Sequence, residues 1–86
     1  MKQLRRQIDG IDKEVIKLLG RRMKLVLKLG KLKKKEGAPV QDKKRETEML
    51  KKLEKQAKKL GLDVKFVNKI YKDILKESRK IQTLTN

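Results

Sequence analysis

The fold is decided by one stretch, Lys2–Lys35, which reads KQLRRQIDGIDKEVIKLLGRRMKLVLKLGKLKKK. Its apolar residues recur in alternating steps of four and three, at Leu4, Ile8, Ile11, Val15, Leu18, Leu25, Leu29 and Leu32. This spacing is that of one face of a long α-helix in heptad register. The register predicts an apolar residue at position 22, where the sequence has Arg22. The stretch therefore predicts a long helix whose apolar stripe is interrupted by a cation.

A second cation lies on the same side of this predicted helix. Lys33 follows Arg22 by eleven residues, and at about 100° per residue the two side chains project within about 20° of each other. Burying a charge costs several kcal/mol unless a partner compensates it. One interpretation is a pocket for an anion inside a helical bundle. The other is two cations that reach past the edge of the stripe into solvent, and the helix alone does not decide between them.

The composition excludes several classes of function. The chain has 86 residues, 36% hydrophobic and 44% charged, which predicts one small domain over residues 1–86. It contains no cysteine and no histidine, which excludes disulfides, thiol nucleophiles, the usual zinc sites and imidazole acid–base catalysis. No signal peptide and no apolar run near the roughly 20 residues of a membrane span are present. We therefore expect a cytoplasmic protein without a membrane partner.

The net charge of +16 raises the question of a nucleic-acid partner. The lysines are spread over the whole chain, and aromatic residues, only 2% of it, do not interleave with them to stack bases. A solvated lysine surface is the favoured interpretation, with a polyanion site as the alternative. In either case the field attracts small anions. Because the solvated surface is favoured, we expect no specific nucleic-acid partner.

The predicted first helix is too long for its own chain to cover. Thirty-four residues at 1.5 Å each span about 50 Å. A compact domain of this size has a radius of gyration near 12 Å and hence a diameter of about 30 Å. The helix therefore needs a second chain beside it, or it must bend.

A second helix is predicted at about Lys43–Leu60. Gly37 and Pro39 end the first helix, and Asp42 is a good N-cap for the second. The inner face of this helix is predicted to consist of Met49, Leu50, Leu53, Ala57 and Leu60.

Arg45 falls in the first turn of the second helix, where the helix dipole favours anions rather than cations. One interpretation pairs it with Glu46 or Glu48 on the surface. The other makes it a further ligand for an anion.

A third helix is predicted at about residues 64–84, after Gly61 and the N-cap Asp63. Its apolar face consists of Phe66, Val67, Ile70, Tyr71, Ile74 and Leu75. Ser78 and Gln82 continue the line of this face. These two polar residues are either a fraying helix end or the hydrogen-bonding wall of a pocket.

An ordered set of residues with its spacings carries a family resemblance. The set is Leu4-Arg5, Ile8, Ile11-Asp12, Leu18-Leu19, Arg21-Arg22, Gly30-Lys31, Lys33, Pro39-Val40, Asp42, Arg45-Glu46, Ser78 and Gln82. It resembles the all-helical (AroQ-type) chorismate mutases over nearly the whole chain. The resemblance implies conversion of chorismate to prephenate, a Claisen rearrangement in phenylalanine and tyrosine biosynthesis. It implies no cofactor and no metal.

The resemblance also implies the role of each site residue. Arg5 and Arg22 match the arginines that grip the two carboxylates of chorismate. Lys33 matches the lysine that reaches the ether oxygen and a carboxylate, and Gln82 matches the residue that hydrogen-bonds the same oxygen. Among the remaining matches, Glu46 with the Asp42 backbone corresponds to the site of the ring hydroxyl, and Arg45 and Ser78 correspond to polar contacts near the carboxylates.

Two features depart from the family pattern. The chain is unusually rich in lysine, and Arg79 stands where the family has an apolar residue near the pocket. Because the chain ends shortly after Gln82, the resemblance implies a stand-alone mutase or an excised domain.

One site cannot take both ends of the first helix from a single chain. Arg5 lies 28 residues before Lys33, which is about 42 Å along a straight helix, and about 25 Å before Arg22. We therefore predict an intertwined all-α homodimer in which each site receives Arg5 from the other chain. The alternatives are a basic helical protein that binds nucleic acid and a non-catalytic helical dimer.

Overall fold

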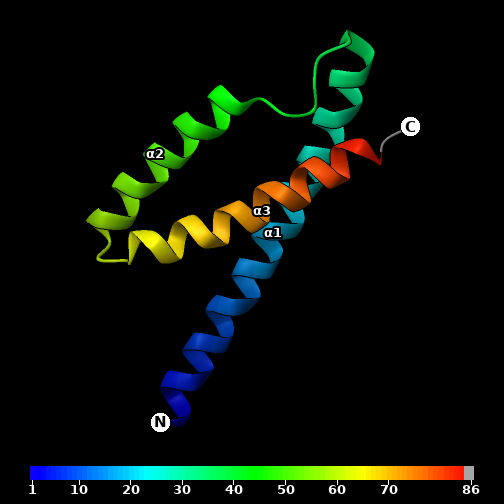
Figure 1. The fold of residues 1–86 in the computed structure, drawn as a ribbon. Coiled ribbons are helices and arrows are strands. Elements are labelled where there is room, and N and C mark those ends of the chain that lie inside the picture. Colours follow the sequence, from blue (N-terminus) through cyan, green and yellow to red (C-terminus); the bar gives the residue numbers. More distant parts are fainter. Residues whose placement is uncertain (85–86) are drawn as a thin grey trace.

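The computed structural model describes residues 1–84, which form three α-helices and no strand. They are α1 (Lys2–Glu36), α2 (Lys43–Lys59) and α3 (Val64–Thr83), with each boundary within one residue of the range expected from the sequence. Figure 1 shows α2 and α3 as a hairpin beside the C-terminal half of α1, whose N-terminal half projects away from them. The prediction of an all-α fold with one very long helix and two shorter ones is confirmed.

Caps at the end of α1 and at the start of α2 determine the path of the segment between them. Gly37 ends α1 with φ 71°, a left-handed conformation that glycine adopts without a steric penalty. The next amide, that of Ala38, donates to the carbonyl of Lys33 at 2.8 Å. At the other end, the Oδ1 atom of Asp42 accepts the backbone N–H of Arg45 at 3.0 Å and caps α2. The bond from Ala38 holds the start of this segment against the last turn of α1, and the Asp42 cap fixes the start of α2.

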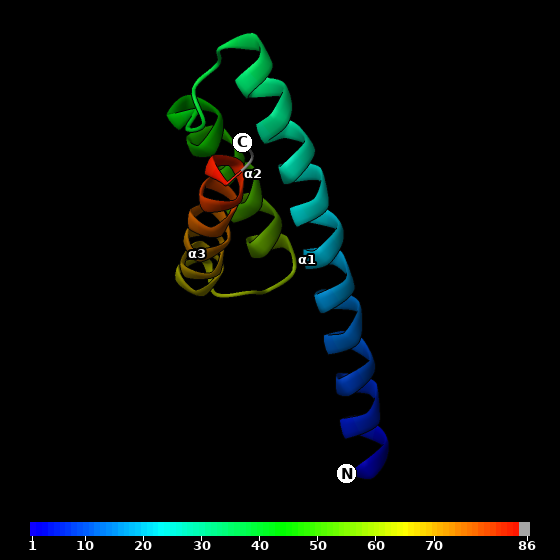
Figure 2. The ribbon, with the colours of Figure 1, turned by 90° about the vertical axis from the view of Figure 1, so that its right-hand side faces the viewer.

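α3 is the helix that contacts both of the others. It packs against both α1 and α2, whereas α1 and α2 do not pack against each other over residues 1–84. Figure 2 shows the α2–α3 hairpin beside one end of α1 only. The α1–α3 contact requires Gly30, because a Cβ atom added there would lie only 2.9 Å from the Cα atom of Gln82. Glycine at this position therefore determines how near α3 lies to α1.

The chain alone buries little apolar surface. Val26, Ala57 and Leu75 are the only buried hydrophobic residues among those the structure describes. The N-terminal stripe of α1 is 47–64% exposed, at Leu4, Ile8, Ile11, Val15 and Leu18. The radius of gyration is 15.6 Å, against about 12 Å for a compact domain of this length. As its length implied, α1 runs unbroken for 35 residues and is not covered by the rest of the chain.

Three residues expected on the apolar faces of the second and third helices are exposed: Leu60, Phe66 (57%) and Ile70 (39%). Leu60 was predicted on the inner face of the second helix but is 66% exposed. Leu60 is the C-cap of α2, which ends at Lys59, and it lines the open hollow between α2 and α3 together with Ala57 and Phe66. No helix within residues 1–84 has the length and apolar character needed to cross a membrane.

Replacing Gly30 by alanine should lower stability, although alanine favours a helix by up to about 1 kcal/mol over glycine. The added Cβ would meet the backbone of Gln82, and forcing the helices apart costs about 1–3 kcal/mol. Gly20→Ala is the matched control, because a Cβ there meets nothing within 4 Å. Urea unfolding, monitored by circular dichroism, should give a higher free energy of unfolding for Gly20→Ala than for the parent and a lower one for Gly30→Ala. A Gly30→Ala protein as stable as Gly20→Ala would contradict the close helix contact.

Candidate active site

A cavity of about 180 Å³ lies where the C-terminal half of α1, the start of α2 and the C-terminal half of α3 meet. Apolar side chains of Val26, Leu29 and Leu75 form part of its wall. Seven of the eight site residues predicted from the sequence line it: Arg22, Lys33, Asp42, Arg45, Glu46, Ser78 and Gln82. The structure therefore brings together residues that are up to 60 positions apart in the sequence.

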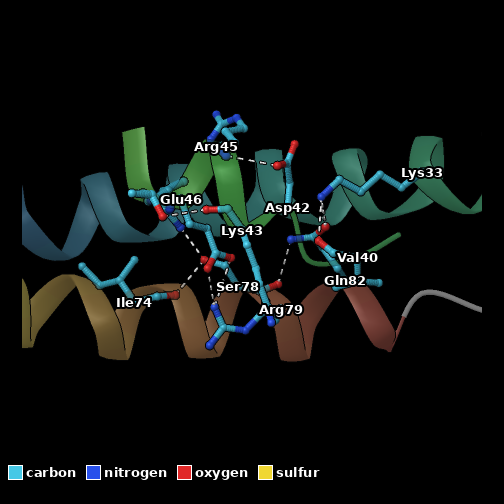
Figure 3. Close-up of polar contacts among 12 residues, drawn as sticks. Lys33, Val40, Asp42, Lys43, Arg45, Glu46, Ile74, Ser78, Arg79 and Gln82 are labelled. Atoms are coloured by element: carbon cyan, nitrogen blue, oxygen red, sulfur yellow. Dashed lines mark hydrogen bonds and ion pairs between the residues drawn. The ribbon is translucent and has the colours of Figure 1, made fainter. Parts of the chain in front are cut away.

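Lys33 is held in place by two neutral oxygens. Its Nζ atom donates to the carbonyl of Val40 at 2.7 Å and to Oε1 of Gln82 at 2.9 Å (Figure 3). Lys33 lies in the last turn of α1, where the helix dipole favours a cation. Within residues 1–84 its ammonium forms no ion pair with a carboxylate. Lys33 is thus a fixed positive charge that no carboxylate in the described part of the chain neutralises.

Arg22 is placed by α3. Its guanidinium donates to Oγ of Ser78, and that hydroxyl in turn donates to the carbonyl of Ile74 at 2.7 Å. Ser78 and Gln82 are both buried, and the Gln82 amide donates to the Ser78 carbonyl at 3.3 Å. Between the two sequence interpretations, the structure favours a polar wall over a fraying helix end.

The first turn of α2 differs from one sequence interpretation. Arg45 does not pair with Glu46 or Glu48 in the described part of the chain. Glu46 pairs instead with Arg79, whose Nη1 atom lies 3.0 and 3.1 Å from the two carboxylate oxygens. The backbone N–H of Arg45 donates to the capping carboxylate of Asp42. Figure 3 shows the guanidinium of Arg45 on the side away from α3. The surface-pair interpretation of Arg45 is therefore wrong.

Two partners in this site were not found from the sequence. The Val40 carbonyl holds Lys33, but a backbone oxygen leaves no signal in residue types. The pairing of Arg79 with Glu46 depends on how α2 and α3 diverge from their shared turn, and no periodicity within one helix shows this. Arg79 was noted only as a departure from the family pattern.

Arg5 does not reach the cavity of its own chain. It is exposed in the first turns of α1, and Figure 1 places that end of α1 far from the hairpin. Seventeen helical residues separate it from Arg22, or about 25 Å. A single chain therefore assembles every predicted site residue except this one.

The cavity has an excess of positive charge. Arg22, Lys33, Arg45 and Arg79 line it together with two acidic residues, Asp42 and Glu46. One of the four cations is neutralised by Glu46. Such a site suits a small molecule with more than one anionic group. A separate hollow of about 290 Å³ between α2 and α3 is lined mainly by apolar side chains such as Leu53, Phe66 and Ile70.

Over residues 1–84 the chain is all-helical, and its cavity is lined by more cations than anions. Comparison with known proteins gives the family: residues 4–83 match the family model described as chorismate mutase type II. The chain belongs to this family. The match confirms the resemblance recognised in the sequence.

Curated relatives agree with the family match. The chain is 33% identical to the T-protein of Haemophilus influenzae over 78 residues, which are 91% of this chain and 21% of that protein. It is 36% identical to the bifunctional chorismate mutase/prephenate dehydratase of Buchnera aphidicola over 74 residues, 86% of this chain and 19% of that protein. A protein of the same name from Aquifex aeolicus is 40% identical over 53 residues, 62% and 15% of the respective chains. The chain thus spans about a fifth of the length of these relatives.

Proposed function

We propose that this chain catalyses the rearrangement of chorismate to prephenate, as part of phenylalanine and tyrosine biosynthesis. The observation that carries the proposal is the convergence of Arg22, Lys33 and Gln82 on one cavity. A basic nucleic-acid-binding protein or a non-catalytic dimer would leave this convergence unexplained. A cytoplasmic location and the lack of a nucleic-acid partner remain predictions.

The reaction needs charge and shape rather than acid–base chemistry. A carbon–oxygen bond breaks while a carbon–carbon bond forms within one molecule, so no nucleophile or proton transfer takes part. The enzyme must hold the chair-like conformer and stabilise negative charge that develops on the ether oxygen. Fixed cations can do both.

Lys33 is arranged for the second task. An ammonium has three N–H donors, and two of them are taken by Val40 and Gln82. The third is left for the ether oxygen of the substrate, with the ammonium already held in place. The Gln82 amide nitrogen is the second donor to this oxygen. Because these donors are fixed before the substrate arrives, little reorganisation accompanies the reaction.

The other polar residues orient the substrate. Arg22, supported by Ser78, binds one carboxylate, and Arg45 lies at the margin of the cavity near the carboxylates. The carboxylate of Glu46 accepts a hydrogen bond from the ring hydroxyl, which also contacts the backbone of Asp42. The remaining carboxylate requires Arg5.

A second copy of the chain supplies Arg5 in this proposal. The exposed stripe of α1 between Leu4 and Leu18 covers the same stripe of a second chain, which buries apolar surface that the monomer leaves in water. Pairing the projecting halves of α1 carries the N-terminal end of each chain toward the hairpin of the other. The result is an intertwined homodimer with two sites, each completed by Arg5 of the other chain.

Activity on chorismate tests the proposal. Purified, folded protein in EDTA-containing buffer should convert chorismate above the background rate, measured as loss of chorismate absorbance. Lys33→Ala should lower kcat/KM at least about a hundredfold, because it removes the fixed charge at the breaking bond. Lys31→Ala, which removes an equal charge from an exposed position two residues earlier, is the control and should change it less than threefold. A parent without activity, or equal effects of both substitutions, would refute the assignment.

Gln82→Glu should move the activity toward acid. An amide donates a hydrogen bond at any pH, whereas a glutamic acid donates only when protonated, with an ordinary pKa near 4.3. The Lys33 ammonium beside this position favours the ionised carboxylate, so kcat/KM of the variant should rise as pH falls from 8 to 5. Gln56→Glu, on exposed α2 surface, is the control for the added charge. If the pH profile of kcat/KM for Gln82→Glu overlays that of the parent, Gln82 does not donate to the ether oxygen.

Complementation tests the origin of Arg5. Arg5→Ala and Arg22→Ala dimers should each be nearly inactive. Unfolded together and refolded at equal amounts, about half of the dimers become hybrids with one intact site, so about a quarter of parent activity should return. Native mass spectrometry verifies the exchange. A fully exchanged mixture as inactive as its parents would show that Arg5 does not act across chains.

A further inference from the structure

The ion pair between Arg79 and Glu46 joins α3 to α2 at the edge of the cavity. One guanidinium nitrogen, Nη1, lies 3.0 and 3.1 Å from the two oxygens of Glu46. The two side chains are only 32% and 20% exposed. A charge-assisted contact of this kind, shielded from solvent, is stronger than an exposed surface pair.

The placement of Glu46 depends on this contact. The turn that connects α2 to α3 lies at the opposite end of the hairpin (Figure 1), and α2 does not pack against α1 in the described residues. A glutamate side chain has three rotatable bonds, and from the first turn of α2 it can extend into solvent as readily as toward the cavity. Figure 3 shows the Arg79 guanidinium and the Glu46 carboxylate facing each other between the two helices.

Arg79 is poorly suited to hold a substrate carboxylate itself. Its charge is already neutralised by Glu46, and turning it toward an anionic ligand would break that pair. Its neighbours on α3 face the other way, since Ser78 contacts Arg22 of α1 and Gln82 contacts Lys33 of α1. Arg79 therefore belongs to the α2 side of the cavity.

We propose that Arg79 is a positioning residue that holds the Glu46 carboxylate in the cavity as the acceptor for the substrate's ring hydroxyl. Through Glu46 it makes the site selective for a substrate that carries this hydroxyl. Arg79 uses only part of the acceptor capacity of the Glu46 carboxylate. An analogue without the hydroxyl leaves the remaining lone pairs without a donor, and a site built to accept a hydroxyl discriminates against such an analogue. The inference rests on the proposed mutase activity and adds a determinant of specificity to it.

Three variants test the inference with two substrates, chorismate and 4-deoxychorismate, in which hydrogen replaces the ring hydroxyl. Arg79→Met removes the contact, and Arg79→Lys keeps a cation. Lys80→Met is the matched control, since it removes one charge from the next, exposed position of α3. Circular dichroism verifies folding, and Arg79→Gln replaces Arg79→Met if the latter does not fold.

Arg79→Met should lower kcat/KM for chorismate roughly tenfold, less than the hundredfold that a 1 Å misplacement can cost, and change it less than twofold for the deoxy analogue. Because one nitrogen makes both contacts, the ammonium of Arg79→Lys should restore chorismate activity to within about threefold of the parent. Lys80→Met should match the parent on both substrates.

Equal losses on both substrates would overturn the proposal, because Arg79 would then act on the fold or on a carboxylate directly. Unchanged or increased activity of Arg79→Met on chorismate would overturn it as well. A parent chain inactive on chorismate would refute the proposed function itself, and the role of Arg79 with it. That result is seen before any variant is compared.

Discussion

Gly30 has no side chain at the point where α3 approaches α1, and the site depends on this close contact. A Cβ there would press on the backbone of Gln82. With glycine, Gln82 lies near enough to accept a hydrogen bond from Lys33 three residues further along α1. The same approach brings Ser78, one turn earlier on α3, to Arg22. The lack of a side chain at Gly30 thus permits two polar contacts between α1 and α3, Lys33 with Gln82 and Arg22 with Ser78.

The contact between α1 and α3 contains two cations, Arg22 and Lys33, that pair with no carboxylate among residues 1–84. Arg22 and Lys33 are half-buried and are held by hydroxyl and carbonyl oxygens rather than by carboxylates. Two cations with only neutral partners weaken the unliganded fold, and binding of an anion relieves the cost. The small core of the single chain makes this cost more important, because few buried apolar residues oppose it. The proposed stabilisation of negative charge in the site and the proposed pairing with a second chain are therefore compatible with each other.

Features that depend on the pattern within one helix were predictable from the sequence, whereas contacts between helices were not. Arg22 and Lys33 were recognised because they violate or adjoin an apolar period, and Asp42 because a cap has a residue signature. The exposed stripe of α1 followed from its length. The Arg45 surface pair with Glu46 or Glu48 was wrong, and for Glu46 the reason is that its carboxylate pairs with Arg79, a residue on another helix. The contact of Lys33 with the Val40 carbonyl was not predictable, since it arises from the path of residues 37–42.

A crystal structure of the chain with a bicyclic dicarboxylate that mimics the chair-like transition state tests the central claim most directly. The inhibitor should lie in the cavity, with its ether oxygen about 3 Å from Nζ of Lys33 and from the amide nitrogen of Gln82. One carboxylate should contact Arg22 and the other Arg5 of a second chain. An inhibitor bound elsewhere, or bound in the cavity with Lys33 and Gln82 turned away from its ether oxygen, would contradict the account.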